Sequence, residues 1–162
     1  MQTLTNHQAI SLVQDQGEGD TVRIGGVSVT LKVTGRETGG RFAVFESTVP
    51  AHHTGPGLHR HRQTTKTFYI LQGMLAFTVG DETVVAGPGS LVVVAPGVLH
   101  RFWNPTAAPA TYLAFLSPAG FEGCLIELAA LAAAESTWPP VDRQKLATLI
   151  AKYDLELHEQ QG

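Results

Sequence analysis

Short segments rich in β-branched and aromatic residues alternate with glycine and proline turns from residue 21 to residue 116. In 27–33 apolar and polar residues alternate strictly, which is typical of a β-strand with one buried face. The segments 66–71 and 74–79 stand on either side of a short turn and predict a β-hairpin. Segment 91–94 is apolar throughout, so we expect it to be buried on both faces. A meander of such strands can close into a barrel.

The period of the apolar residues changes after this series of strands. Segment 121–135 is rich in alanine and leucine and repeats apolar residues every three or four positions, which predicts a helix. Asp142 can cap a second helix with one apolar stripe. We expect these helices, at about 118–156, to close one mouth of the barrel or to pack on its outside, although the stripe could instead form a dimer contact. The sequence thus predicts a single all-β domain over 1–162, with a barrel core at about 21–116 and a short C-terminal helical extension.

Three histidines stand beside the turns of this predicted barrel. His59 and His61 are two residues apart, and residues with that spacing point to the same face of a strand. His100 opens the short strand-like segment 100–104. A pair with this spacing also occurs by chance, so the alternative is that the histidines are simply solvated or packed. If the barrel closes, the three imidazoles can meet and offer a site for a divalent transition metal ion.

The stretch 55–104 resembles the two sequence motifs of the cupin family. The matching residues of the two motifs are His59, His61 and Gly73 for the first, and Gly89, Gly97, His100 and Asn104 for the second. The proline of the second motif, Pro96, stands one position later than the pattern expects. The resemblance implies the double-stranded β-helix of cupins, which is a jelly-roll barrel.

In cupins that bind a metal, three histidines and a glutamate usually hold one divalent ion. The resemblance therefore implies His59, His61 and His100 as ligands of one iron, nickel, copper, manganese or zinc ion, but Lys66 takes the place of the glutamate. An ammonium about 4 Å from a dication is repelled by roughly 8 kcal/mol at an effective dielectric of about 20. Either Lys66 turns away, or it is kept neutral by a lowered pKa, or the site binds no metal.

Other residues are weaker candidates for the site. Glu46 could supply a carboxylate if it lined the barrel, but a place on the outer surface is favoured. His52 and His53 are neighbours on a predicted rim loop, so they point apart and we expect them to be solvated. The single cysteine, Cys124, cannot form an internal disulfide and is interpreted as a buried apolar thiol, which fits a reducing cytoplasm.

Strand alternation also predicts which residues line a pocket. If Lys66 points inward, then so do Phe68 and Ile70, and Phe102 follows His100 in the same way. Such a wall suits a small, partly apolar organic molecule, although each of these residues could simply be packed in the core. A charged Lys66 would stabilise an anionic substrate, whereas a neutral one could accept a proton, so Lys66 is a candidate catalytic residue.

Among cupins the chain is similar to small single-domain proteins likened to quercetin dioxygenase. That resemblance implies a metal-dependent dioxygenase, an oxidoreductase, acting on a small hydroxylated aromatic compound such as a flavonol or a catechol. One alternative is a metal-assisted isomerase or hydrolase that uses the ion as a Lewis acid. The other is a non-enzymatic protein that binds a small molecule and stays metal-free because Lys66 replaces the glutamate.

The net charge and the hydropathy of the chain limit the classes of partner that we expect it to bind. A formal net charge of -3 leaves no basic excess, so we expect no binding to nucleic acid. Residues 1–15 show no signal-peptide pattern, and no apolar stretch is long enough to cross a bilayer. We therefore expect a cytoplasmic protein without membrane contact. A homodimer is a further expectation, because dimers are common among cupins.

Overall fold

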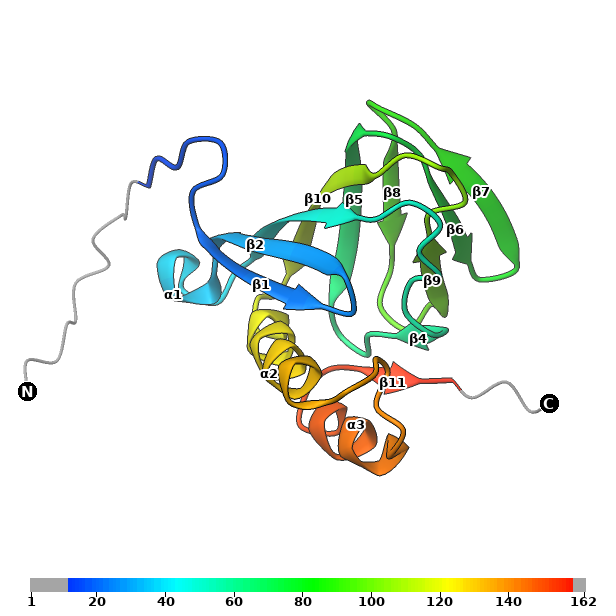
Figure 1. The fold of residues 1–162 in the computed structure, drawn as a ribbon. Helices are drawn as coiled ribbons and strands as arrows, with labels where there is room; N and C mark the ends of the chain where they lie inside the picture. The colour runs from blue at the N-terminus through cyan, green and yellow to red at the C-terminus, as the bar shows by residue number, and fades with distance from the viewer. Residues whose placement is uncertain (1–11, 159–162) are drawn as a thin grey trace, which may run out of the picture.

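The computed structural model describes residues 12–158 and consists mainly of two antiparallel β-sheets with helices at one end (Figure 1). The first sheet has the strand order β1 (Asp20–Ile24), β2 (Val27–Val33), β3 (Ala43–Val49), β10 (Ala110–Ser117), β5 (Thr65–Gln72) and β8 (Leu91–Val94). The second has the order β11 (Glu156–Leu157), β4 (His59–Arg60), β9 (His100–Trp103), β6 (Leu75–Val79) and β7 (Glu82–Ala86). This arrangement confirms the predicted all-β barrel. Most of the segment in which a signal peptide was sought, 1–15, lies outside the described residues.

Four aromatic side chains form the centre of the barrel, where the inner faces of the two sheets meet. Phe68 and Tyr112 come from the first sheet, and Phe77 and Phe102 come from the second. The ring centroid of Phe68 lies 5.0 Å from that of Phe77, 5.8 Å from that of Phe102 and 5.3 Å from that of Tyr112. Burying a side chain of this size contributes roughly 1.5–3 kcal/mol, so this cluster fixes the two sheets against each other.

The predicted hairpin between 66–71 and 74–79 does not form. β5 pairs with β10 and β8, whereas β6 pairs with β7 and β9 in the other sheet. Gly73 stands between them with φ 72°, and a Cβ there would meet the backbone of Ala110, so this position requires glycine. The sequence signals a turn correctly, but the turn carries the chain from one sheet to the other.

The prediction that 91–94 is buried on both faces is also wrong. β8 is the edge strand of the first sheet, and its outer face is open. Leu91 is 59% exposed and Val93 is 54% exposed, whereas Val94 on the inner face is buried. An apolar run alone cannot separate a strand covered on both faces from one whose outer side chains face solvent.

Both predicted helices are present at the end of the barrel. α2 (Phe121–Ala134) packs against β1, and α3 (Arg143–Ile150) packs against α2 (Figure 1). The side chain of Asp142 accepts a hydrogen bond from the backbone N–H of Gln144 and caps α3, as predicted. The short helix α1 (Gly35–Thr38), which begins with a capping box, was not predicted. Among the described residues, no helix is long and apolar enough to span a membrane.

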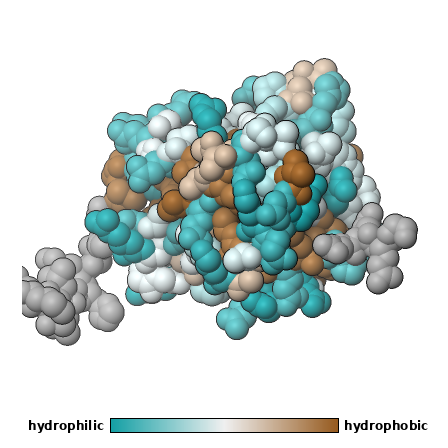
Figure 2. Space-filling model, turned by 60° about the horizontal axis from the view of Figure 1, so that its bottom comes forward, coloured by the Kyte–Doolittle hydropathy of each residue, from teal (hydrophilic) through white to brown (hydrophobic). Residues whose placement is uncertain are grey.

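The helical end of the molecule has its own small apolar core. Its buried members are Cys124, Leu149, Ile150 and Leu155. Cys124 is fully buried, so its interpretation as a buried apolar thiol is confirmed, and burial raises the pKa of this thiol to about 12. Figure 2 shows this end of the molecule, where hydrophobic surface is broken up by hydrophilic groups.

Candidate metal centre

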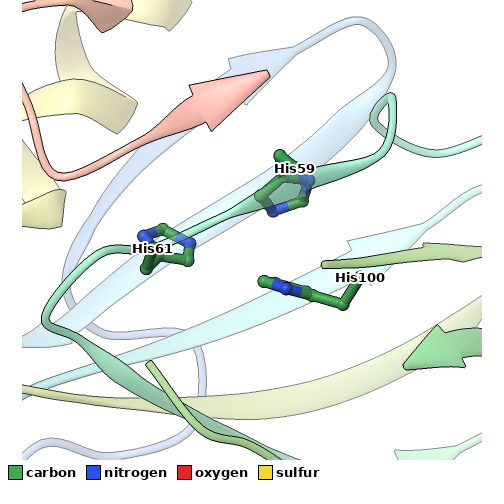
Figure 3. Close-up of side chains that lie close together, drawn as sticks. All are labelled: His59, His61 and His100. Carbon is green, nitrogen blue, oxygen red and sulfur yellow. The ribbon is translucent and has the colours of Figure 1, made fainter. Parts of the chain in front are cut away.

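The three histidines of the predicted site lie together inside the barrel (Figure 3). His59 on β4 pairs directly with His100 at the start of β9, and His61 follows on the same chain as His59. The ring centroids of His59 and His100 are 4.3 Å apart, and that of His61 lies 5.6 Å and 5.7 Å from them. One ring nitrogen of each histidine lies within 4.8 Å of the others, which is close enough for one metal ion to contact all three.

The other ring nitrogen of each histidine is held by the backbone. Each Nδ1 atom donates a hydrogen bond to a main-chain carbonyl oxygen. His59 donates to Gly57 at 2.8 Å, His61 to Asp154 at 2.9 Å and His100 to Val98 at 3.0 Å. A carbonyl oxygen can only accept a hydrogen bond, so Nδ1 carries the proton and Nε2 keeps its lone pair. Backbone contacts of this kind fix the ring orientation of metal-binding histidines.

Two of these lone pairs are buried without a partner. The Nε2 atoms of His61 and His100 have no hydrogen-bond partner within the described part of the chain. Leaving a buried acceptor unsatisfied costs about 1–3 kcal/mol, so such atoms call for an explanation. A metal ion bound by Nε2 of His59, His61 and His100 would satisfy them, and neutral imidazole is the form that binds metals. The histidines therefore fit a divalent transition metal ion.

Burial keeps the three imidazoles neutral. Burial lowers the pKa of His61 to about 3 and that of His100 to about 4, and it holds the pKa of His59 well below its usual value. The positive charge of nearby Lys66 lowers each of these pKa values further. At neutral pH the site therefore offers unprotonated nitrogen donors.

Lys66 points into the barrel rather than toward its outer surface. Its side chain extends inward from β5 and is only 7% exposed. The Nζ atom lies 4.9 Å from the ring centroid of Phe68 and 5.4 Å from that of Phe121, which are cation–π distances. Burial lowers the pKa of Lys66 to about 8, so most of these amines still carry a proton at neutral pH.

A cavity of about 250 Å³ lies beside His59 and Lys66, whereas His61 and His100 are not among the residues that line it. On the barrel side it is lined by His59, Lys66, Phe102 and Tyr112. Helices α2 and α3 and the segment 155–157 line the opposite side with mostly aliphatic residues. The helices thus close one mouth of the barrel, which is one of the two placements expected from the sequence.

The three residues predicted to bind substrate lie at different depths. Phe102 lines the cavity, as expected. Phe68 and Ile70 are fully buried on the inner face of β5, but neither lines the cavity. Strand alternation predicts correctly that their side chains point inward. It cannot predict how far along the barrel the cavity extends, and here the packed aromatic centre fills the space around Phe68.

Glu46 cannot supply the missing carboxylate. The buried residues of β3 are Ala43, Phe45, Ser47 and Val49, so Glu46 points to the opposite, outer face, as the sequence favoured. Within the described residues, no aspartate or glutamate lines the cavity. The fourth ligand of the motif is therefore absent here, and nothing in the cavity replaces it.

The two loop histidines differ from each other. His52 is exposed, as expected. His53 is part of the cavity wall, which corrects the expectation that it is merely solvated. Its Nδ1 accepts a hydrogen bond from the backbone N–H of Gly55, and its Nε2 donates to the carbonyl oxygen of Gly25. Both ring nitrogens are engaged, so His53 shapes the entrance rather than offering a ligand.

Asp154 is a contributor that sequence reasoning missed. Its backbone carbonyl oxygen accepts the hydrogen bond from His61. Its side-chain carboxylate accepts hydrogen bonds from the loop that follows His61, where the donors are the backbone N–H groups of Arg62, Gln63 and Thr64 and the hydroxyl of Thr64. The loop that follows His61 is thereby tied to the C-terminal segment. No local pattern could signal this link, because the partners are about 90 residues apart.

Comparison with known proteins agrees with this fold. The family described as the cupin domain matches residues 45–116, which include all three histidines. The quercetin 2,3-dioxygenase of Bacillus subtilis (strain 168) is 27% identical over 96 residues. The match covers 58% of this chain but only 28% of that enzyme, so the chain spans little more than a quarter of the length of its curated relative.

Solved structures of low sequence identity share the fold. KdgF from Halomonas sp. superposes with a TM-score of 0.62 at 14% identity, covering 70% of this chain and 99% of that one. A predicted oxalate decarboxylase from Thermotoga maritima has a TM-score of 0.62 at 19% identity, covering 66% and 99%. The polyketide cyclase RemF from Streptomyces resistomycificus has a TM-score of 0.58 at 18% identity, covering 67% and 80%. Residues 45–116 thus match the cupin domain family, and the two-sheet barrel to which they belong has the cupin fold.

Proposed function

We propose that this protein is a metal-dependent cupin dioxygenase that acts on a small hydroxylated aromatic compound of the flavonol or catechol kind. The observation that carries the proposal is the convergence of three buried, neutral imidazoles, one of which, that of His59, lines an apolar cavity. The similarity to a quercetin 2,3-dioxygenase supports the reaction class. It covers only a fraction of that enzyme, so the activity and the substrate are inferences about this chain.

His59, His61 and His100 would hold the ion through their Nε2 atoms. When bound, the ion supplies Lewis-acid chemistry and, for iron, nickel, copper or manganese, redox chemistry toward dioxygen. The walls from α2 and α3 are mostly aliphatic, and charge interactions are stronger in surroundings of low polarity than in water. Lys66 places an ammonium at the cavity wall, where it stabilises negative charge on an oxygen of the substrate.

Oxygen consumption tests this proposal directly. The metal-loaded protein is supplied with a panel of flavonols and catechols in an oxygen-electrode cell, and loss of each compound is followed by absorbance. We expect oxygen uptake that matches substrate loss, and its disappearance in the double variant His59→Ala/His61→Ala. The matched control is His52→Ala, which removes an exposed histidine outside the site. A metal-loaded protein that consumes no oxygen with any compound of the panel would contradict the dioxygenase assignment.

A second candidate function is non-enzymatic binding of a small molecule by the metal-free protein. The observation that favours it is Lys66, which replaces the carboxylate of the motif with a group that repels cations. Stoichiometric ligand binding without turnover, in protein that takes up no metal, would select this function. A metal-assisted isomerase or hydrolase would instead turn over its substrate without consuming oxygen.

A further inference from the structure

The charge of the cavity is unbalanced. Among the described residues that line it, Lys66 is the only one with a charged side chain. The two histidines of the wall, His59 and His53, are hydrogen-bonded to the backbone, and most of the remaining lining is aliphatic or aromatic. A ligand that enters this cavity therefore meets one positive charge and no negative one.

The ammonium of Lys66 has no acceptor of its own. Within residues 12–158 its Nζ makes no hydrogen bond or ion pair, although it can donate three hydrogen bonds. Its neighbours are the rings of Phe68 and Phe121, which attract a cation but accept no strong hydrogen bond. Burying a charge without a partner is unfavourable, and proteins normally pair or neutralise such a group.

We infer that Lys66 is the anchor for an anionic oxygen, so that the cavity selects small apolar molecules that carry one carboxylate, phenolate or enolate. The inference rests on the proposed function for the role of the cavity as the ligand site, but it does not depend on a bound metal. The anionic oxygen lies at Nζ of Lys66, and the apolar body of the ligand lies against the aliphatic side of the cavity formed by α2 and α3.

Metal binding would strengthen the same selection. The three imidazoles are neutral donors, and no acidic side chain of the described chain lines the cavity. A divalent ion would add two positive charges to that of Lys66 in a site of low polarity. An anionic ligand offsets this charge, whereas a neutral ligand leaves it uncompensated. Both the metal-free and the metal-loaded protein should therefore favour anions.

Binding of matched acids and amides to the metal-free protein tests the inference. The probes are acetate, benzoate and trans-cinnamate, each compared with its own amide by titration calorimetry. The acid and amide of a pair have nearly the same shape, so the difference in affinity reports the charge. A hydrogen bond to a charged group is worth roughly 1.5–3 kcal/mol, so we expect at least one carboxylate to bind on the order of 10- to 100-fold more tightly than its amide.

Two variants separate Lys66 from other sources of this preference. Lys66→Met removes the charge but keeps a long apolar side chain, and we expect it to bind each acid and its amide equally. Lys152→Met makes the same change at an exposed lysine outside the cavity and should keep the preference. The inference is overturned if no carboxylate binds the metal-free protein, if acids and amides bind alike, or if the preference survives in Lys66→Met.

These binding experiments can show the anion site to be right or wrong separately from the dioxygenase proposal. If the metal-free protein prefers carboxylates through Lys66 but takes up no metal, the anion site stands and the dioxygenase proposal fails. If the preference appears only after metal is added and persists in Lys66→Met, the ion rather than Lys66 holds the anion. In that case this inference fails while the proposed metal centre stands.

Discussion

The Nδ1 atom of His61 lies 2.9 Å from the carbonyl oxygen of Asp154, so a candidate metal ligand of the barrel is oriented by the C-terminal segment. The side chain of the same Asp154 accepts the backbone hydrogen bonds of the loop that follows His61. β11, which comes directly after this segment, pairs with β4, the strand that carries His59. The segment is thus a structural part of the histidine site as well as one side of the cavity.

Asp154→Ala keeps the backbone carbonyl that accepts a hydrogen bond from His61, but it removes the carboxylate that holds the loop after His61. We therefore expect metal binding to weaken only indirectly, by up to roughly tenfold. The substitution leaves two partly buried donors, the backbone N–H and the hydroxyl of Thr64, without their acceptor, so it should also lower the free energy of unfolding by about 1–3 kcal/mol. Competition with a chromophoric chelator measures the affinity, and urea unfolding of the metal-free protein measures the stability.

Glu156→Ala is the matched control for this variant. It removes a neighbouring carboxylate whose ion pairs with Arg60 and Arg62 lie at the surface, where such pairs contribute about 0–1 kcal/mol. We expect it to leave metal affinity nearly unchanged. A loss of stability in Asp154→Ala without any loss of metal affinity would mean that the carboxylate of this aspartate supports the fold but not the position of His61.

Removing the charge of Lys66 should stabilise the metal-free protein. Burial lowers the pKa of Lys66 from 10.5 to about 8, so around neutral pH the folded state carries an unfavourable buried charge that corresponds to roughly 3 kcal/mol. Between these two pKa values the unfolded state binds more protons than the folded state, so the free energy of unfolding of the wild-type protein should rise with pH. Below about pH 8 both states are protonated, and the full penalty applies.

We expect Lys66→Met to be more stable than the wild type at neutral pH. Residue 66 of this variant should no longer contribute to the increase of the free energy of unfolding between about pH 8 and 10.5. Urea unfolding of both proteins across this range measures the difference. Lys152→Met, at an exposed lysine, should keep the wild-type profile. If Lys66→Met is less stable than the wild type at neutral pH, then the ammonium has a partner that offsets its burial.

Lys66→Glu should strengthen metal retention, because it replaces a repelling ammonium with the carboxylate of the cupin motif. We expect affinity to rise by at least roughly tenfold over the wild type, with Lys66→Gln lying between the two because it only removes the charge. Chelator competition on the three proteins measures the order. Weaker retention in Lys66→Glu than in Lys66→Gln would mean that residue 66 does not reach the ligand position.

Local rules predict much of this site from the sequence. The spacing of His59 and His61 places both rings on one side of the chain, and the match to a second motif identifies His100 as their partner. Alternation along β5 predicts that Lys66, Phe68 and Ile70 share one face, which the structure confirms. Each of these inferences depends on spacing over a few residues or on a motif of known order, and metal occupancy itself stays a prediction.

The features that the sequence did not predict, or predicted wrongly, depend on contacts between residues that are far apart in the sequence. The segments flanking Gly73 predict a hairpin because a turn signal says nothing about which strands will pair, and here it joins two sheets. Leu91 is exposed because no element covers the outer face of the edge strand β8. The contact between His61 and Asp154 joins residues 93 positions apart through a two-residue strand, which is too short to leave a pattern.

The central claim is that three histidines bind a metal ion although Lys66 replaces the fourth ligand. It is tested most directly by plasma mass spectrometry of protein purified without added metal and without a chelating tag, in parallel with His59→Ala/His61→Ala and the surface control His52→Ala. We predict near-stoichiometric iron, nickel, copper, manganese or zinc in the wild type and His52→Ala, and none in the double variant. A wild-type protein that stays metal-free after reconstitution, or a double variant that keeps its full metal content, would contradict the claim.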